Sequence, residues 1–458
     1  MSKQKLKQYS YPSRTTRTAT AAQAQRAVVK RVTVCGRVLS REERRGQVLL
    51  VVGDETGTVT CIAPAETAAQ LYDIVECAGV VQAHRVQADA VRVLVPNRRV
   101  PTDASQWEQL IRSPEARAML QKRAAVLAAI RAFFAKRGFL ECDTPALVAA
   151  PGMEPYLTPF ETTLFDERGT KTSAYLITSP EYSLKKLLAS GFERIYDLAH
   201  VYRNGEEWGK THNPEFLMLE WYRAYASYRE IMDDVEELVR FVAKETVGDV
   251  RVPFHGATID LSVWERITVS EAFRQYAGMD PDVLRDRDAL FNAVRAKGYQ
   301  PDEKERYEDL FFRVFLNEIE PCLGQRKPTI VYDYPAPLSA LAKLKEDDPA
   351  FAERFEVYIG GLELSNGYTE LNDPVEQRER LVEERALRKK LKKPQPPIDE
   401  DLIAALEVGM PPAGGTALGM DRLVMLMTDA SDIDQVRFLP TSTLFRGSGK
   451  NVRSSQEN

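Results

Sequence analysis

The chain has 458 residues, of which 44% are hydrophobic and 28% charged, and its formal net charge is −5. This composition is ordinary for a globular protein and excludes a fibrous, collagen-like or mostly disordered chain. Apolar runs such as Val48 to Val52 are far too short to span a bilayer, and the net charge provides no whole-protein attraction to nucleic acid.

The five cysteines are scattered along the chain, and no Cys-x-x-Cys pair occurs. A disulfide framework or a cysteine-based zinc site is therefore not expected. No N-terminal segment joins a basic start to an apolar stretch, which argues against a secretory signal. These features predict a cytoplasmic protein without membrane contact.

The N-terminal segment is basic. The first 41 residues contain ten Lys or Arg and no Asp or Glu. This composition is typical of a solvated arm, and we predict that residues 1–27 are disordered. A transit peptide and an arm that contacts nucleic acid share this composition and stay open as alternatives. The polar residues 446–458 are likewise predicted to form a disordered tail.

Residues 28–100 change to short β-type runs separated by turns that contain Gly or Asp. Strands are predicted at 32–38, 47–52, 58–62, 75–82 and 90–95. Five short strands within about 70 residues are typical of a small barrel such as an OB-fold. Tyr72 is the only Phe, Tyr or Trp in this region.

After a linker at 96–105, residues 107–136 have a strongly helical composition, and Arg137-Gly138 is expected to end the helix. Phe139 to Pro145 follows as an extended segment. Long helices are then predicted at 228–247, 302–318 and 375–393, between strands rich in Phe, Tyr and Val. We predict that residues 107–440 form one α+β domain.

Several familiar sites can be excluded. The four histidines form no His-Glu-x-x-His pattern, and no Gly-x-Gly-x-x-Gly follows a strand. Gly447-Ser448-Gly449-Lys450 lacks the upstream glycine and the final Ser or Thr of a P-loop. Any ATP site must therefore use another framework.

Residues 202–222 are the first of three segments that place polar groups in apolar strands. They read as two strands joined by a charged loop. Arg203 suits a bidentate phosphate contact, and Phe216 could stack on a purine. Glu220 and Tyr222 are two apart on one strand and should point to the same face.

Residues 355–373 and 414–426 are the other two segments. Glu356 and Glu363 are embedded in β-type sequence. Buried carboxylates need a partner, and Mg²⁺ that bridges ATP phosphates is one. The glycines at 414, 415 and 419 allow a close backbone approach to a ligand, and Arg422 opens an apolar helix.

The three segments resemble motif 2, the strand before motif 3, and motif 3 of the class II aminoacyl-tRNA synthetases. Residues 139–145 resemble motif 1, whose proline lies at the dimer interface in that class. The strings at 212–216, 366–373 and 419–423 are similar to those of the lysyl branch. This resemblance, which covers 107–439, implies an antiparallel sheet of six or seven strands with helices and a homodimer.

A related family, the elongation factor P lysine ligases, is similar in further details. These ligases are paralogues of lysyl-tRNA synthetase that attach β-lysine to a lysine of elongation factor P. The resemblance lies in Ser179-Pro180-Glu181-Tyr182, in residues 159–162, in the Trp of 220–223 and in residues 402–421. We therefore identify the chain as a member of this family with an added N-terminal barrel, which the ligases usually lack.

The resemblance implies the chemistry and the site residues. Lysine or β-lysine would be activated by ATP and Mg²⁺ as an adenylate, without a protein nucleophile, and passed to elongation factor P. Arg203 and Arg422 would act on the phosphates. The implied ATP-binding residues are Arg203, Glu206, His212, Asn213, Phe216, Glu363, Leu364, Gly419 and Arg422. The implied substrate-binding residues are Ser179, Pro180, Glu181, Glu220, Tyr222, Asn366 and Glu370. Glu356 and Glu363 would hold the metal.

Some alternatives stay open. Gly205 is an extra residue in the motif 2 loop, so the motif carboxylate is either Glu206 or Glu207. His212 either touches phosphate or is only a hydrogen-bonded loop residue. The protein could instead be a lysyl-tRNA synthetase with a reduced anticodon-binding domain that acts on tRNA-Lys, or a catalytically silent binding module. The scarcity of aromatic residues in 28–100 predicts weak or no anticodon recognition, because OB-folds bind single strands by stacking bases on aromatic rings.

Overall fold

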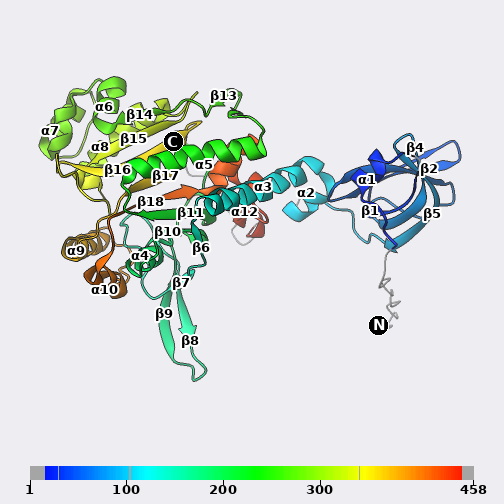
Figure 1. Ribbon diagram of the computed structural model, residues 1–458, viewed down its shortest axis with the longest axis horizontal. Coiled ribbons are helices and arrows are strands. Elements are labelled where there is room, and N and C mark those ends of the chain that lie inside the picture. The colour runs from blue at the N-terminus through cyan, green and yellow to red at the C-terminus, as the bar shows by residue number, and fades with distance from the viewer. Residues whose placement is uncertain (1–15, 29, 103–104, 340, 446–458) are drawn as a thin grey trace. The chain divides into compact units, whose positions relative to one another are not determined.

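The computed structural model describes residues 16–28, 30–102, 105–339 and 341–445 (Figure 1). The chain divides into two compact units, Met1–Ala118 and Met119–Asn458. The predicted tail at 446–458 and residues 1–15 of the predicted arm lie outside the described residues. No helix in the described part of the chain is both long and apolar enough to cross a bilayer.

The first unit contains a closed barrel with strand order β1-β2-β3-β5-β4 (Figure 1). Alternate residues of its strands point inward, as in β3, where Val59, Cys61 and Ala63 are buried. Small and β-branched side chains fill the core, and the predicted OB-like barrel is confirmed. The strands are β1 (Arg31–Arg44), β2 (Gln47–Asp54), β3 (Gly57–Pro64), β4 (Ile74–Gln82) and β5 (Arg85–Val95).

Residues 16–27 differ from the predicted disordered arm. Ala21–Arg26 form helix α1, whose N-cap Thr20 accepts a hydrogen bond from the backbone N–H of Gln23. Ala21 and Ala24 are buried in the barrel core cluster. The backbone N–H of Ala21 also donates to Asp54 at the end of β2, 2.8 Å away. The alanines supply a small apolar face, which a count of charges does not reveal.

The helix predicted over 107–136 is two helices, α2 (Gln106–Arg112) and α3 (Pro114–Lys136). Ser113 between them is extended, with φ −110° and ψ 104°. A residue before proline is disfavoured in the helical region, so the first helix ends there. Pro114 then opens α3, where its missing N–H has no helical partner to lose.

The second unit is built on an eight-stranded sheet with the order β14-β15-β16-β17-β18-β11-β10-β6. The inner pairs are antiparallel, whereas β14–β15 and β10–β6 are parallel. The prediction of six or seven strands was too low, because the edge strands β6 and β14 have only three and four residues and are hard to recognise in the sequence. The sheet strands are β6 (Leu140–Cys142), β10 (Arg194–Tyr202), β11 (Glu215–Ala224), β14 (Glu265–Thr268), β15 (Thr329–Pro335), β16 (Phe351–Ile359), β17 (Leu362–Thr369) and β18 (Ala413–Gly419).

Helices α3, α5 and α11 cover one face of this sheet, and their apolar side chains form the main core with those of β11 and β16 (Figure 1). The predicted α+β arrangement of a mainly antiparallel sheet with helices is confirmed. A second core lies among α6, α7 and α8, in the chain between β14 and β15. Besides α3, the α-helices described in this unit are α4 (Glu181–Ala189), α5 (Tyr228–Thr246), α6 (Val269–Ala277), α7 (Arg287–Ala296), α8 (Tyr307–Val314), α9 (Pro374–Lys390), α10 (Glu400–Gly409), α11 (Met420–Thr428) and α12 (Thr441–Leu444).

Shorter elements complete the second unit. The helix predicted at 302–318 begins only at Tyr307, and its last part is a π-helical turn at Phe315–Ile319. A three-stranded sheet holds β7 (Leu147–Val148), β8 (Glu161–Phe165) and β9 (Lys171–Leu176), and a two-stranded sheet holds β12 (Arg251–Phe254) and β13 (Ala257–Asp260). Single 3₁₀ turns lie at Pro281–Arg285, Glu320–Cys322, Ala336–Leu338 and Ile433–Val436.

The buried Asp421 ties α11 to the elements around it. It forms ion pairs with two buried arginines, Arg123 of α3 and Arg437, the latter at 2.7 Å. Its Oδ2 also accepts a hydrogen bond from the backbone N–H of Leu217, 3.2 Å away. One carboxylate therefore neutralises two buried cations from distant parts of the sequence.

Replacing Asp421 by Asn is expected to lower the free energy of unfolding by about 3–5 kcal/mol, because it leaves two buried guanidinium groups without a counter-charge. Urea denaturation followed by circular dichroism measures the change. Glu383→Gln, at an exposed position of α9, is the control and should change it by less than about 0.5 kcal/mol. Equal stabilities of the two variants would contradict the prediction.

Candidate active site

A cavity of about 490 Å³ lies against the central strands β11, β17 and β18. Strand β11 shows why it forms there, because its side chains alternate between the two faces of the sheet. The cavity is lined by Phe216, Met218, Glu220 and Tyr222. The intervening Leu217, Leu219 and Trp221 belong to the core shared with α3, α5 and α11. The spacing of Glu220 and Tyr222 therefore correctly predicted a shared face.

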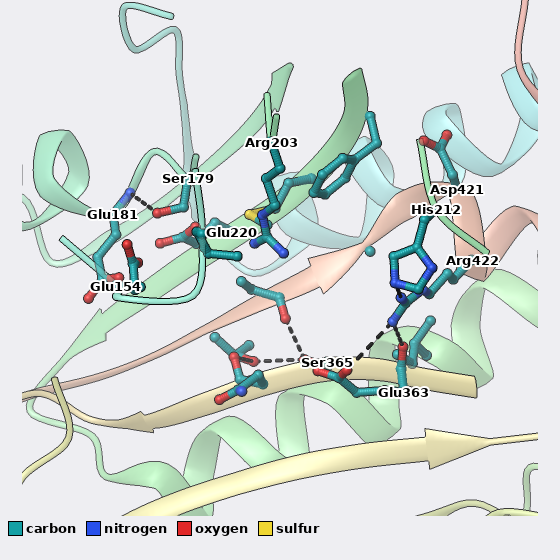
Figure 2. A pocket seen from close by; sticks show the side chains of 18 of the residues that line it. Glu154, Ser179, Glu181, Arg203, His212, Glu220, Glu363, Ser365, Asp421 and Arg422 are labelled. Carbon is teal, nitrogen blue, oxygen red and sulfur yellow. Dashed lines mark hydrogen bonds and ion pairs between the residues drawn. The ribbon is translucent and has the colours of Figure 1, made fainter. Parts of the chain in front are cut away.

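One end of the cavity is acidic. Figure 2 shows Glu154, Glu181 and Glu220 gathered at this end. Oε1 of Glu220 accepts a hydrogen bond from the Tyr222 hydroxyl at 2.6 Å, whereas its buried Oε2 has no hydrogen-bond partner among the described residues. An unpaired buried oxygen costs about 1–3 kcal/mol, and a cationic group of a ligand would remove that cost.

A buried lysine lies behind this end. The Lys185 ammonium is 2.6 Å from Oε1 of Glu181 and 2.6 Å from Oε2 of Glu370. Glu370 does not line the cavity but lies just behind Gly415, which does. A Cβ on Gly415 would come within 2.3 Å of the Tyr222 ring and 2.8 Å of Oε1 of Glu370. Gly415 therefore keeps the wall thin at this point.

The pKa values of these groups are shifted. Burial raises the pKa of Glu370 to about 8, although Lys185 acts in the opposite sense. Burial also raises the pKa of Glu220, and the Glu181 carboxylate adds to that shift. Burial alone would lower the pKa of Lys185, but Glu181 and Glu370 outweigh it and raise the pKa. Without a bound cation, Lys185 is thus charged and the raised pKa values favour protonated Glu220 and Glu370. A bound ammonium group would favour their ionised forms.

Ser179 and Pro180 lie at the start of α4. Ser179 lines the cavity, and its Oγ accepts a hydrogen bond from the backbone N–H of Glu181 at 3.4 Å. Pro180 is the N-cap residue of α4 and does not line the cavity. Helix α4 thus directs Glu181 inward and, one turn later, places Lys185 beside it.

Arginines mark the rest of the cavity. In the view of Figure 2, Arg203 lies between the acidic end and a group formed by His212, Glu363 and Arg422. The Arg203 guanidinium lies 5.1 Å from the centre of the Phe216 ring, and its buried Nε has no hydrogen-bond partner among the described residues. Burial lowers the pKa of Arg203. A phosphate would supply the missing acceptor.

Arg422 is oriented by three contacts. Its Nη1 donates to the carbonyl oxygen of Glu363 at 2.6 Å, and its Nε donates to that of Thr211 at 3.4 Å. Its Nη2 lies 3.1 Å from Nε2 of His212, which must accept because guanidinium only donates. Burial and the Arg422 charge lower the pKa of His212. His212 is therefore neutral and holds Arg422 in place.

The motif 2 loop brings Glu206, and not Glu207, to the cavity. Glu207 is exposed and pairs with Lys210 at 3.3 Å. Asn213 also lines the cavity; its Nδ2 donates to Asp434 at 3.2 Å, while its buried Oδ1 has no hydrogen-bond partner within the described ranges. Leu364 of β17 and Gly419 at the start of α11 complete this side.

The two predicted metal ligands differ in position. Glu363 lines the cavity, with Oε2 3.7 Å from Nη1 of Arg422. Glu356 does not line it, and both its oxygens are engaged. Their donors are the hydroxyls of Tyr334 (2.7 Å) and Tyr358 (2.6 Å), Nη2 of Arg354 (2.7 Å) and Nδ2 of Asn366 (3.2 Å).

A carboxylate that faces the cavity suits Mg²⁺, so Glu363 fits the predicted role. Glu356 would first have to release four donors, and in this structure it instead holds Arg354 and Asn366, which line the cavity. The described part of the chain contains no group of three or more His, Cys, Asp or Glu that could hold a metal by itself. Phosphate oxygens of a nucleotide would have to complete the coordination of any Mg²⁺ at Glu363.

The structure thus brings all the predicted site residues to the cavity lining except Pro180, Glu356 and Glu370. Sequence reasoning missed Glu154, Arg354 and Tyr368, which also line it. The alternation of Asn366, Tyr368 and Glu370 could have indicated Tyr368. The i, i+4 spacing from Glu181 could likewise have indicated Lys185. Glu154 carries no such signal, because it lies in a loop without periodicity.

Comparisons with known proteins agree with this geometry. A profile of the family "tRNA synthetases class II (D, K and N)" matches residues 104–443. The lysine--tRNA ligase of Pelotomaculum thermopropionicum is 39% identical over 340 residues, which make up 73% of this chain and 65% of that protein. That of Moorella thermoacetica is 40% identical over 336 residues, 72% of this chain and 67% of the relative. That of Synechococcus sp. (strain CC9311) is 34% identical over 442 residues, 90% of this chain and 88% of the relative. The chain thus spans about two thirds of the length of the first two relatives.

Proposed function

Since this chain belongs to the class II tRNA synthetases of the D, K and N type, a family of ATP-dependent ligases, we propose that it activates lysine with ATP and transfers it to tRNA-Lys. The observation that carries this proposal is the pairing, within one cavity, of an acidic end with an arginine-lined end. The acidic end suits the two ammonium groups of lysine. The other end suits the phosphates of ATP. The names of the relatives support lysine and tRNA as the substrates.

In the first step a carboxylate oxygen of lysine attacks the α-phosphorus of ATP. A new O–P bond forms, the bond to the bridging oxygen breaks, and pyrophosphate leaves. Arg203 would bind the α-phosphate and Arg422 the γ-phosphate end, with Glu206, His212 and Asn213 around the nucleotide and Phe216 beside the adenine. Glu363 would hold Mg²⁺, which when bound neutralises phosphate charge.

In the second step a hydroxyl or amine of the acceptor attacks the acyl carbon, and AMP leaves. Neither step needs a protein nucleophile, because positioning and charge neutralisation supply the catalysis. Glu181 and Glu220 would bind the ammonium groups of the substrate, with Ser179, Tyr222 and Asn366 beside them. Glu370 would add its negative charge from behind Gly415. These groups would hold the carboxylate of lysine at the α-phosphate.

Elongation factor P is the second candidate acceptor, and the barrel favours it. Tyr72 is the only Phe, Tyr or Trp between residues 28 and 100, and it lies in the turn before β4 with φ +68°. Strand β2 presents Val and Leu where a nucleic-acid-binding OB-fold would present aromatic rings. A barrel without a stacking platform is a poor anticodon reader, and β-lysine in place of lysine would accompany this alternative.

The test is an acceptor assay. The purified protein, ATP, Mg²⁺ and labelled lysine or β-lysine are mixed with total tRNA and elongation factor P, and the acid-precipitable label is treated with ribonuclease. We expect ribonuclease-sensitive label from lysine, with little effect of an anticodon substitution because the barrel lacks stacking residues. Label that survives ribonuclease on a protein band would replace this proposal with the elongation factor P reaction.

We also propose that the protein acts as a homodimer in the cytoplasm. Four apolar side chains are exposed on β6, which lies within motif 1, and on β7 and β8, which follow it in the chain, as expected where a second copy covers the protein. They are Leu140, Leu147, Leu164 and Phe165. All five cysteines are free, which supports a reducing compartment.

A further inference from the structure

The loop between β7 and β8 carries a carboxylate into the cavity. Glu154 lines the acidic end, close to Glu181 and Ser179 in the view of Figure 2. Its Oε2 is buried and has no hydrogen-bond partner among the described residues. Carboxylates are rarely buried without a partner, because the lost hydration costs free energy. The arrangement is therefore suited to a cationic donor that arrives with the substrate.

The backbone of this loop is held from outside the cavity. Nη1 of Arg388, a fully buried residue of α9, donates to the carbonyl oxygens of Glu154 at 2.7 Å and Leu157 at 2.9 Å. Nζ of Lys393 donates to the carbonyl oxygen of Tyr156 at 2.7 Å. The backbone N–H of Met153 donates to the Tyr182 hydroxyl at 3.2 Å. These contacts fix the loop and leave the Glu154 carboxylate facing the cavity.

Gly152 provides the space for this carboxylate. A Cβ on Gly152 would come within 2.4 Å of Oε2 of Glu154 and 2.9 Å of Oγ1 of Thr178. Such a contact would push the carboxylate away from its present position. Gly152→Ala therefore displaces the charge without removing it.

The position of Glu154 relative to Arg203 indicates which part of the substrate it meets. The loop that carries Glu154 runs beside Arg203, because the backbone N–H of the next residue, Asn204, donates to the carbonyl oxygen of Thr158 at 2.7 Å. Glu370, in contrast, follows the last residue of β17 and so lies at the opposite end of that strand from Glu363. The reacting carboxylate must lie at the α-phosphate beside Arg203. The ammonium group bonded nearest to that carboxylate therefore falls closest to Glu154, and the far ammonium group falls toward Glu220 and Glu370.

We propose that Glu154, together with Glu181, forms the subsite that binds the ammonium group next to the reacting carboxylate, and so sets the preference between positional isomers of a diamino acid. This inference rests on the proposed activation of lysine. It assigns a substrate-binding role to a residue outside the recognised motifs. Arg388 is a positioning residue for this subsite, because it acts only through the loop.

Amino-acid-dependent ATP–pyrophosphate exchange tests the proposal. We expect Glu154→Gln to raise KM for lysine by about 10- to 100-fold, as for loss of a hydrogen bond to a charged group, and to leave KM for ATP unchanged. Gly152→Ala should raise KM for lysine in the same direction. Glu383→Gln is the control, because this carboxylate is exposed on α9 and does not line the cavity. Both of its constants should stay unchanged.

Substrate analogues locate the contact. 6-Aminohexanoate lacks the ammonium group next to the carboxylate, and norleucine lacks the far one. Both analogues are tested as competitive inhibitors. The inhibition constant of norleucine should rise in Glu154→Gln by about the same factor as KM for lysine. The inhibition constant of 6-aminohexanoate should be the same for the variant and the wild-type protein.

Equal losses with both analogues, or an unchanged KM for lysine, would overturn the subsite. If wild-type protein exchanges with no diamino acid, the proposed function fails and the inference with it. If the wild-type protein is active with lysine but Glu154→Gln has the same KM for lysine, the subsite inference fails and the proposed function stands.

Discussion

Glu370→Gln is expected to abolish lysine-dependent ATP–pyrophosphate exchange, with a loss of at least about 100-fold, while the protein stays folded. Glu370 is 1% exposed, and its Oε2 lies 2.6 Å from the Lys185 ammonium. Its Oε1 has no hydrogen-bond partner among the described residues and lies behind the thin wall at Gly415. The substitution removes a negative charge from a cluster that already contains one ammonium group, so a second ammonium group would enter a site with too little counter-charge.

The measurement is exchange at saturating ATP over a range of lysine concentrations, with circular dichroism as the check on folding. Glu407→Gln, at an exposed position of α10, is the control and should behave as wild type. Full exchange by folded Glu370→Gln would remove this residue from the amino-acid site. It would leave the arginine-lined end of the cavity unaffected.

Arg203→Lys is expected to lower kcat/KM for ATP in the exchange reaction by about 100-fold or more, the effect of losing a major electrostatic contact to the transition state. Lysine keeps the positive charge but loses the planar fork that binds two phosphate oxygens together. The guanidinium lies over the Phe216 ring, and its Nε is left without an acceptor. Since this hydrogen bond is made only when the phosphate is bound, its loss should affect the reaction more than it affects folding.

Arg229→Lys is the matched control for this experiment. The Arg229 guanidinium also lies over aromatic rings, 5.1 Å from that of Tyr228 and 5.6 Å from that of Tyr332, but it does not line the cavity. It should leave kcat/KM for ATP unchanged. Comparable losses in the two variants would mean that arginine–aromatic packing, rather than phosphate binding, explains the effect at Arg203.

The linear sequence determined those features that depend on local chemistry. Period-two alternation placed Glu220 and Tyr222 on one face of a strand, and the five β-type runs of 28–100 predicted a small barrel. The composition around Tyr228–Thr246 and Pro374–Lys390 predicted helices whose ends lie within three residues of those observed. The motif strings predicted the class II tRNA synthetase family. Each of these signals lies in one continuous stretch of sequence, so it can be read without knowing which residues are its neighbours in space.

Tertiary structure alone decided the rest. The edge strands β6 and β14 are too short to show a period and are strands only because β10 and β15 pair with them. Glu356 was predicted to be a metal ligand from its place in a strand. In the structure it is a buried hydrogen-bond acceptor, and one of its donors is Tyr334 of another strand. Glu154 enters the cavity because Arg388, 234 residues away in the chain, holds its loop. Contacts between residues far apart in the chain depend on how elements pack, and no local pattern encodes that.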